Sequence, residues 1–252
     1  MKKIIILSIL FLTCHFVHAN IVTINDTIPR KWSLTIQAGA TFGNFSTKSV
    51  NFTPAHENNF SFLPGFKVGV LADYKIAKNW FLTFGLSVDY LRVQNKFEQM
   101  QRADTLLKST EEYRLTYINI PLQFSYKHSF SEKLAIKFNL GAYIAYGIVG
   151  NVTTENEYSV DSKIINTITE TSDFFVDNTQ QQLYYRIDSG LSAEISLIFS
   201  SKFKIGVGYY FGIKNYAFQP NWVGLGTTSS YAQKNHNIFI TVGYMINKFG
   251  RD

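Results

Sequence analysis

Cysteine is almost absent from this chain of 252 residues. The one cysteine, Cys14, lies near the N-terminus, so the rest of the chain has no disulfide framework. Charged residues are also scarce, at 17% against roughly 25% in an average soluble protein. Aromatic residues, in contrast, reach 16%. This combination excludes a disordered chain, which has few aromatics and a high net charge, and it is unusual for the surface of a soluble domain.

The N-terminus reads MKKIIILSILFLTCHFVHAN. Lys2 and Lys3 precede an apolar stretch, and Ala19 ends a small-residue cleavage site, which predicts a signal peptide over 1–19 and a short periplasmic segment over 20–30. The alternative, an uncleaved anchor helix, is disfavoured because a membrane span needs about 20 apolar residues. Removing the two lysines lowers the net charge from +6 to +4, and no Lys/Arg-rich run follows, so no nucleic-acid partner is expected.

No later hydrophobic run is long enough for a transmembrane helix, but apolar and polar residues alternate in eight runs. A period of two is typical of β-strands. The expected strands are 32–42, 64–76, 79–94, 113–127, 133–149, 184–200, 202–214 and 236–248.

The connections between these runs alternate in length. Three are short, namely 77–79, HSFSE and Ser200-Ser201, whereas 43–63, 95–112, 150–183 and 215–235 are long and polar. Short turns at one end and long loops at the other are typical of outer-membrane barrels. The sequence therefore predicts an all-β fold, an eight-stranded antiparallel up-and-down transmembrane β-barrel over 31–250, with ten strands if KIINTITETSDFFV also crosses the membrane.

One face of each run is apolar, and the other carries glycine and charge. Glycine weakens a water-facing strand but makes room in the narrow lumen of an eight-stranded barrel. We therefore expect the apolar face to contact lipid and the other face to line the lumen. The charged residues expected to pair there are Lys67, Asp73, Asp89, Lys137, Arg186, Asp188, Glu194 and Lys204. The alternative is a soluble lipocalin-like barrel with the apolar face around a ligand cavity.

Aromatic residues mark both ends of the apolar face. Trp80 and Tyr90 share a face ten residues apart, which is about 25 Å along the normal of a tilted strand and matches the apolar band of a barrel. The residues expected at the lipid interface are Trp32, Tyr74, Trp80, Tyr90, Tyr126, Tyr146 and Tyr244. Pro121 lies within a run and cannot donate to a ladder, so we expect an inward-facing β-bulge there.

Several strand segments carry a resemblance to a known family. YINIPLQFSYK, LAIKFNLGAYIAYG, GFKVGVLADYKIAKNWFLTFGLSVDY, GVGYYFGIKN and FITVGYMINKF resemble the PorT-like outer-membrane β-barrel family of Gram-negative bacteria. The resemblance covers about 30 to 250 and implies an integral barrel of the cell outer membrane. One branch of that family is tied to export of secreted proteins. The last strand, with Gly243, Tyr244, Ile246 and Phe249, resembles the signal read by barrel-insertion machinery, although three residues follow the last aromatic.

The sequence shows no catalytic constellation, metal-ligand spacing or nucleotide motif, so we expect neither an enzyme nor a cofactor. His128 beside Ser129 suggests a hydrolase, but the two lie in a short turn where adjacent side chains point apart. His236 with Asp173 or Asp177 is a second arrangement, at the outer rim, that would suggest a protease. Aromatic residues in the long loops could instead form a binding surface. The candidate contacts are Phe60, Phe174, Phe175 and Trp222.

The sequence thus predicts a non-enzymatic outer-membrane protein that acts through long extracellular loops, by adhesion, partner binding or membrane integrity. A component of a protein-secretion apparatus and a small-solute pore are the alternatives within the membrane. The expected partners are outer-membrane lipid, barrel-insertion machinery and an unknown extracellular or secretion-system molecule. The sequence leaves the oligomeric state open.

Overall fold

The computed structural model describes residues 31–50, 59–102, 105–160, 163–175, 185–200, 202–215 and 230–246. Its strands belong to one compact unit, Trp32–Lys248. They are β1 (Trp32–Val50), β2 (Asn59–Lys75), β3 (Trp80–Arg102), β4 (Thr105–Ser129), β5 (Leu134–Val160), β6 (Lys163–Asp173), β7 (Ile187–Phe199), β8 (Phe203–Gly212) and β9 (Ser230–Met245). No helix within these ranges is long and apolar enough to cross a membrane.

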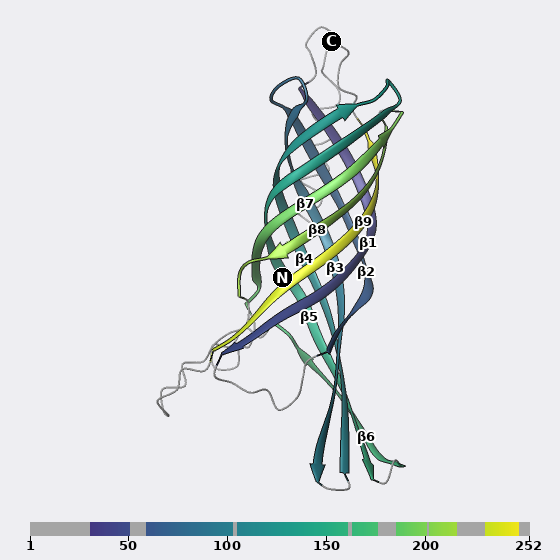
Figure 1. Ribbon diagram of the computed structural model, residues 1–252, viewed down its shortest axis with the longest axis vertical. Coiled ribbons are helices and arrows are strands. Elements are labelled where there is room, and N and C mark those ends of the chain that lie inside the picture. Colours follow the sequence, from purple (N-terminus) through teal and green to yellow (C-terminus); the bar gives the residue numbers. More distant parts are fainter. Residues whose placement is uncertain are drawn as a thin grey trace, which may run out of the picture. The chain divides into compact units, whose positions relative to one another are not determined.

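The strands form one antiparallel sheet that closes on itself (Figure 1). Its order is β4-β3-β2-β1-β9-β8-β7-β5-β6, and β4 also pairs with β5. That additional pairing completes a ring of eight strands and leaves β6 outside the ring. Closure gives each of the eight strands a partner on both sides, which removes the open edges of a sheet. The predicted all-β, eight-stranded up-and-down barrel is confirmed.

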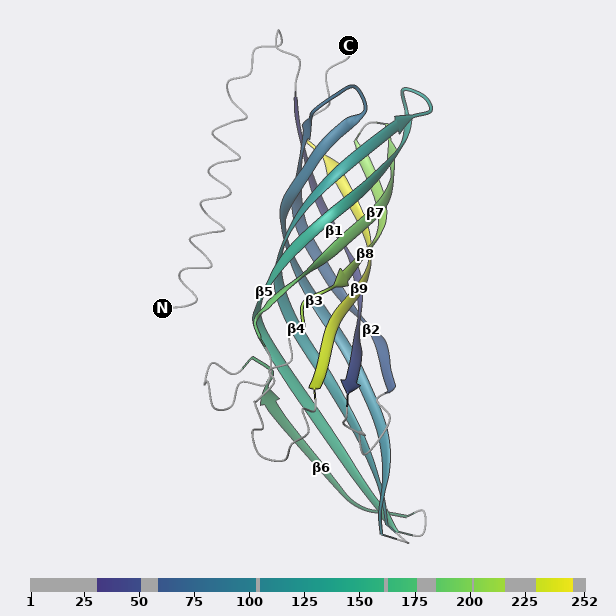
Figure 2. The ribbon, with the colours of Figure 1, turned by 60° about the vertical axis from the view of Figure 1, so that its left-hand side comes forward.

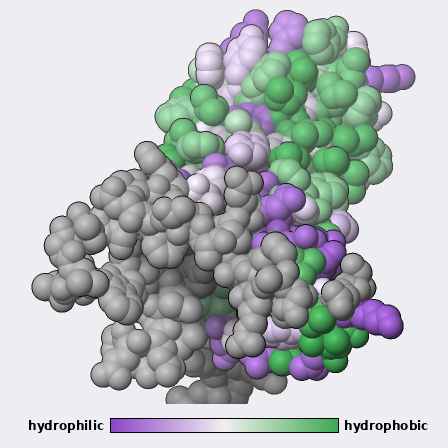
Figure 3. All heavy atoms as spheres, turned by 60° about the horizontal axis from the view of Figure 1, so that its bottom comes forward, coloured by the Kyte–Doolittle hydropathy of each residue, from purple (hydrophilic) through white to green (hydrophobic). Residues whose placement is uncertain are grey.

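The two faces of the barrel wall differ as predicted. The apolar face points outward, where Phe124 is 65% exposed and Leu140 is 66% exposed. The intervening residues, such as Gln123 and Asn139, are buried in the lumen. Figure 3 shows hydrophobic side chains gathered over the outside of the strands. This arrangement contradicts the lipocalin-like alternative, which requires the apolar face inside.

Several strands are longer than predicted: β1 continues to Val50 and β9 begins at Ser230, inside the predicted loops 43–63 and 215–235, and β3, β4 and β5 extend through the predicted loops 95–112 and 150–183. The pairing of β3 with β4 continues to Arg102↔Thr105, and that of β4 with β5 to Thr105↔Val160. Much of the predicted loops 95–112 and 150–183 is therefore sheet. The prediction of loops was wrong because polar residues occupy both faces of these segments, so the apolar alternation that identified the barrel strands is missing there. We call this part the distal sheet: β3 from Leu91, β4 up to Thr116, β5 from Val149, and all of β6 (Figures 1 and 2).

Two β-bulges lie where the barrel passes into the distal sheet. The register of β2 with β3 shifts between Leu63 and Phe66, next to Tyr90. The register of β4 with β5 shifts between Thr116 and Tyr117. Because a bulge bends its strand and increases the twist, the two together redirect the strands at one level of the barrel.

The predicted bulge at Pro121 is absent from the described pairings. Pro121 does face inward and is buried, but its register with β5 is continuous from Tyr117 to Ser129. The register with β3 is also unchanged across it, although no pair forms at Gly85 or Leu86. The missing N–H of the proline is accommodated by a gap in the pairing of β3 with β4, without an extra residue in either strand.

β6 corrects a second prediction about the region 150–183. Its residues, KIINTITETSD, form a strand, but this strand pairs with β5 beyond the barrel wall and does not complete a ten-stranded barrel. Alternating Thr and Ile residues have high β propensity, which explains why a polar segment forms a strand. The predicted signal peptide, 1–19, and Trp222 lie outside the described residues, and the intact mass of the exported protein would test the predicted cleavage.

The pairing of β6 with β5 is testable because the chain after Cys14 contains no cysteine. Thr153 and Thr171 are register partners whose hydroxyl oxygens lie 3.2 Å apart. We expect a T153C/T171C variant to form a disulfide on mild oxidation, since the two side chains share one face. A T153C/I168C control should stay reduced. A gel shift on reduction measures the bond, and equal oxidation of both variants would contradict an ordered strand.

Candidate functional site

A column of ion pairs fills the lumen of the barrel. The first pair joins Lys67 on β2 to Asp89 on β3, with Lys67 Nζ 2.8 Å from Asp89 Oδ1, and both side chains are buried. Lys67 also donates to the Ser87 hydroxyl at 2.8 Å and to the Tyr210 hydroxyl at 3.1 Å. Asn119 donates to the other carboxylate oxygen of Asp89 at 2.7 Å. Every member is hydrogen-bonded, which a buried ion pair requires if it is not to destabilise the fold.

A second pair lies closer to the short turns. Lys137 Nζ of β5 is 2.6 Å from Asp73 Oδ1 of β2, and Lys137 also donates to the Thr83 hydroxyl at 3.0 Å. Thr83 in turn donates to Asp73 at 2.5 Å. Since β2 and β5 are not neighbours in the sheet, this pair spans the lumen.

A third pair joins Lys204 on β8 to Glu194 on β7, with 2.5 Å between Lys204 Nζ and Glu194 Oε1. Lys204 also donates to Gln37 Oε1 at 3.3 Å. A Cβ added at Gly206 would lie 2.5 Å from the same Glu194 oxygen. This glycine therefore makes room for the carboxylate, as the sequence suggested for the glycines of this face.

The two remaining predicted residues differ from these pairs. Asp188 is buried in the lumen, where it accepts hydrogen bonds from Tyr143 at 3.0 Å and Asn235 at 3.4 Å. Arg186 is only half-buried and lies beside the end of β7. It donates to the backbone oxygen of Gly147 at 3.1 Å. The structure thus places seven of the eight predicted residues in the lumen, and Arg186 at its rim.

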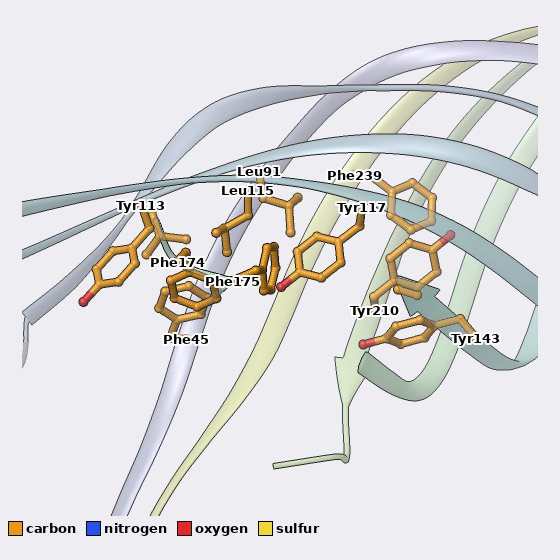
Figure 4. Packing of buried hydrophobic residues seen from close by; sticks show 12 residues of the cluster. Phe45, Leu91, Tyr113, Leu115, Tyr117, Tyr143, Phe174, Phe175, Tyr210 and Phe239 are labelled. Atoms are coloured by element: carbon orange, nitrogen blue, oxygen red, sulfur yellow. The ribbon is translucent and has the colours of Figure 1, made fainter. Parts of the chain in front are cut away.

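An aromatic cluster packs inside the barrel (Figure 4), and the ring centroids of its Tyr210 and Phe239 lie 4.8 and 5.0 Å from Lys67 Nζ. It draws inward-facing side chains from β1, β3, β4, β5, β8 and β9 and adds two residues that follow β6. Its buried members are Phe45, Leu91, Val93, Tyr113, Leu115, Tyr117, Tyr143, Ala145, Phe174, Phe175, Tyr210 and Phe239. We call this set the aromatic plug. Its strand-borne members were detectable in the sequence, because Tyr117, Tyr143 and Phe239 interrupt the polar face of their runs.

The aromatic plug overturns a prediction about Phe174 and Phe175. Both were expected as exposed contacts, but they are 1% and 5% exposed. Phe174 N–H donates to the backbone oxygen of Gly150 at 2.7 Å. Phe60, another expected contact, is partly buried against the same cluster. The two phenylalanines lie inside because β6 returns from the tip of the distal sheet and delivers them to the mouth of the barrel.

The position of Phe175 is fixed by two glycines and by Arg186. A Cβ on Gly147 or Gly150 would collide with its ring, at 2.8 Å for Gly150. Arg186 donates to the Phe175 backbone oxygen at 3.0 Å, and its guanidinium lies 5.3 Å from the ring centroid. Arg186 therefore holds the aromatic plug in place, a role that only the tertiary contacts show.

A charged cluster lies on the outward face of the distal sheet. Glu112 accepts from Arg114 Nη2 at 2.9 Å and from Arg92 Nη2 at 2.7 Å. These hydrogen bonds, from Arg114 first and then Arg92, hold the pKa of Glu112 at about 2, well below its usual range, against the opposing effect of partial burial. The cluster joins β3 to β4 directly above the outward face of the barrel.

The predicted interface aromatics all lie on the outward face and gather near its two ends. Near the short turns, Trp32 contacts Tyr74 with ring centroids 4.7 Å apart, and Trp80 contacts Tyr126 at 5.0 Å. Tyr244 lies at the same end, 5.4 Å from Phe203. At the other end of the wall, Tyr90 contacts Phe66 at 5.2 Å, and Tyr146 is 51% exposed.

The described residues bring no catalytic group together. His236 shares hydrogen bonds with the Ser46 hydroxyl at 2.8 Å and the Tyr209 hydroxyl at 2.9 Å. Asp173 is paired in register with Asn151, and Asp177 lies outside the described part of the chain. His128 lies near the end of β4, where its ring packs edge-on against Phe130 of the following turn. No group of three or more His, Cys, Asp or Glu residues in the described ranges could hold a metal ion.

Residues 23–217 match the family of the outer membrane protein beta-barrel domain. This chain belongs to that family. The match covers most of the chain and supports a location of the barrel in the outer membrane. A search of the curated proteins gives no match.

Several solved structures are similar at low identity. Ail, the attachment invasion locus protein of Yersinia pestis, is 12% identical with a TM-score of 0.31, covering 86% of this chain and 100% of that one. OprG from Pseudomonas aeruginosa is 11% identical with a TM-score of 0.40, covering 85% and 96%. Neisserial surface protein A is 13% identical with a TM-score of 0.35, covering 85% and 99%.

Removal of one lumen charge should destabilise the barrel. In a Lys67→Met variant, Asp89 is left buried without its cation, which costs about 3–5 kcal/mol of unfolding free energy. The double variant K67M/D89L should be more stable than K67M, because no uncompensated charge remains. Urea unfolding in detergent measures both, with K202M in an exposed turn as the control. A K67M variant as stable as the wild type would contradict the buried pair.

The distal sheet should lose stability in acid through Glu112. Its folded pKa, about 2, is below the unfolded value of about 4.3, so its contribution is complete above pH 4.3 and is lost as the pH falls toward 2. E112Q should be less stable at pH 7 and show a weaker pH dependence. Unfolding of the distal sheet in urea is measured by the fluorescence of a dye attached to the cysteine of a T167C variant. E155Q is the control. Identical pH profiles for E112Q and the wild type would refute this contribution.

Proposed function

We propose that this protein is a non-enzymatic outer-membrane barrel that acts by presenting the distal sheet to a partner outside the cell. One observation carries the proposal: three barrel strands run on for a dozen residues beyond the aromatic belt, and a ninth strand is added to them. A barrel that served only to span the membrane would need strands of about 9–11 residues. The extra sheet has no role in spanning, so it supplies a surface.

The contents of the lumen support a surface function over conduction. Eight strands enclose an interior just wide enough for side chains, and here three ion pairs and the aromatic plug occupy it. We infer that solutes do not cross the barrel and that the ion pairs are structural. Single-channel recording in a planar bilayer should stay silent, and steady conductance steps would count against this inference.

The direction of the distal sheet follows from the connections. The short turns, the start of β1 and the end of β9 lie at one end of the barrel. In outer-membrane barrels this is the periplasmic end. The distal sheet then lies outside the cell. Adhesion or partner binding is the activity that an exposed sheet with free edges supports best.

A second candidate rests on the strand motifs that resemble the PorT-like family. A role in a secretion apparatus would also use the distal sheet or the periplasmic turns to hold other components. Copurification from native outer membranes distinguishes the two, because a secretion component should bring a constant set of membrane partners. A surface receptor or adhesin should not.

A variant that lacks the tip of the distal sheet, which we call the shaved variant, tests the main proposal. Lys96 and Thr110 are register partners, as are Asn156 and Ile168, so each hairpin can be closed there with Asn-Gly. This removes 97–109 and 157–167 and keeps the aromatic plug. We expect the shaved barrel to keep its heat-dependent gel shift but to lose binding of proteoliposomes to cells that bind the full chain. Equal binding by both proteins would show that the removed tip of the distal sheet is not the binding surface.

A further inference from the structure

The outer edge of β6 has no partner among the described strands. β6 pairs with β5 along one edge, from Asn151↔Asp173 to Val160↔Lys163. All eleven of its residues are exposed, including Ile164 at 62% and Ile165 at 63%. An unpaired edge presents backbone N–H and C=O groups that template the addition of another strand. The edge therefore has the chemistry to accept an extended chain.

The order of residues along β6 selects which chain fits. Lys163 stands at one end, Glu170 and Asp173 stand toward the other, and the middle is made of uncharged Thr, Ile and Asn. An antiparallel second copy would bring the Lys163 end of each strand to the Asp173 end of the other. A parallel copy would oppose like charges at both ends. Opposite charges across a strand pair stabilise it and like charges destabilise it.

We propose that two copies of this protein associate through their β6 edges, antiparallel, about a twofold axis near Ile168. The proposal rests on the function proposed above and names the partner as a second copy of the same chain. This axis places Lys163 of each copy opposite Asp173 of the other, and the β-bulge at Ile165, where the register with β5 shifts, lies within the overlap. Ile168, 39% exposed, would meet its own counterpart at the axis.

The antiparallel arrangement fixes where the second barrel lies. β6 runs from the tip of the distal sheet at Lys163 back to Asp173, beside Asn151 and the aromatic plug (Figure 2). In the second copy this direction is reversed, so its barrel lies beyond the tip of the first. Both barrels cannot then share one membrane. The association joins two facing outer membranes, with an overlap of about 35 Å for eleven residues.

Charge reversal at the two ends of β6 tests this arrangement. Proteoliposomes of the full chain should cluster, as measured by light scattering. K163E and D173K should each lower the association between vesicles at least about tenfold, since each change makes two charge contacts repulsive. A mixture of K163E vesicles with D173K vesicles should cluster again, because every end contact between the two variants is attractive.

The controls separate folding, net charge and the proposed function. Heat-dependent gel mobility verifies that each variant is folded, and K202E, in an exposed turn at the other end of the barrel, makes the same change of net charge as K163E. Three outcomes would overturn the proposal: no clustering of wild-type vesicles, clustering insensitive to either reversal, or no recovery in the mixture. If any of these occurs while the shaved variant still loses cell binding, the distal sheet binds a different partner and the function proposed above stands.

Discussion

A backbone that faces hydrocarbon has no water to satisfy its N–H and C=O groups, and the whole barrel follows from this constraint. The pairing of β4 with β5 closes the ring and leaves none of its eight strands with a free edge. Closure with eight strands fixes a narrow lumen, and a narrow lumen has to be filled. The lysines and carboxylates inside are long enough to fill it, and they are tolerated because they form ion pairs within it. Lys137 and Asp73, from strands that are not neighbours, show that the filling also ties the wall together.

The constraint ends where the strands leave the membrane. In water, an unpaired edge no longer costs several kcal/mol per polar group, so β6 can lie outside the ring with one free edge. The two bulges next to Tyr90 and Tyr117 mark this change of solvent, because there the strands are bent out of the register of the wall. Above them, Glu112 and its two arginines replace apolar contacts on the outward face. The distal sheet is thus formed by strands of the barrel that have left the membrane, where water can satisfy the backbone groups of an unpaired edge.

The aromatic plug connects these two regions. Phe174 and Phe175 follow directly after β6, so the strand that forms the free edge also delivers the side chains that close the lumen. Gly147 and Gly150 leave room for the ring of Phe175, and Arg186 holds its backbone. A change in the position of β6 would therefore change the packing of the aromatic plug at the mouth of the barrel. This coupling explains why the one described strand outside the ring is followed directly by two buried phenylalanines.

The sequence by itself determined the barrel, its strand number and its two faces, because lipid on one side and a packed lumen on the other impose a strict period of two. It also identified the lumen charges, since Lys67, Asp89 and their counterparts share that period. It did not determine the distal sheet, because polar residues occupy both faces of those segments and remove the alternation, and KIINTITETSD, which is exposed at every residue, therefore looked like a loop. Nor could it place Phe174, Phe175 and Arg186, whose burial depends on which strand lies beside them. Only the tertiary structure decided those positions, because they result from pairings between strands far apart in the chain.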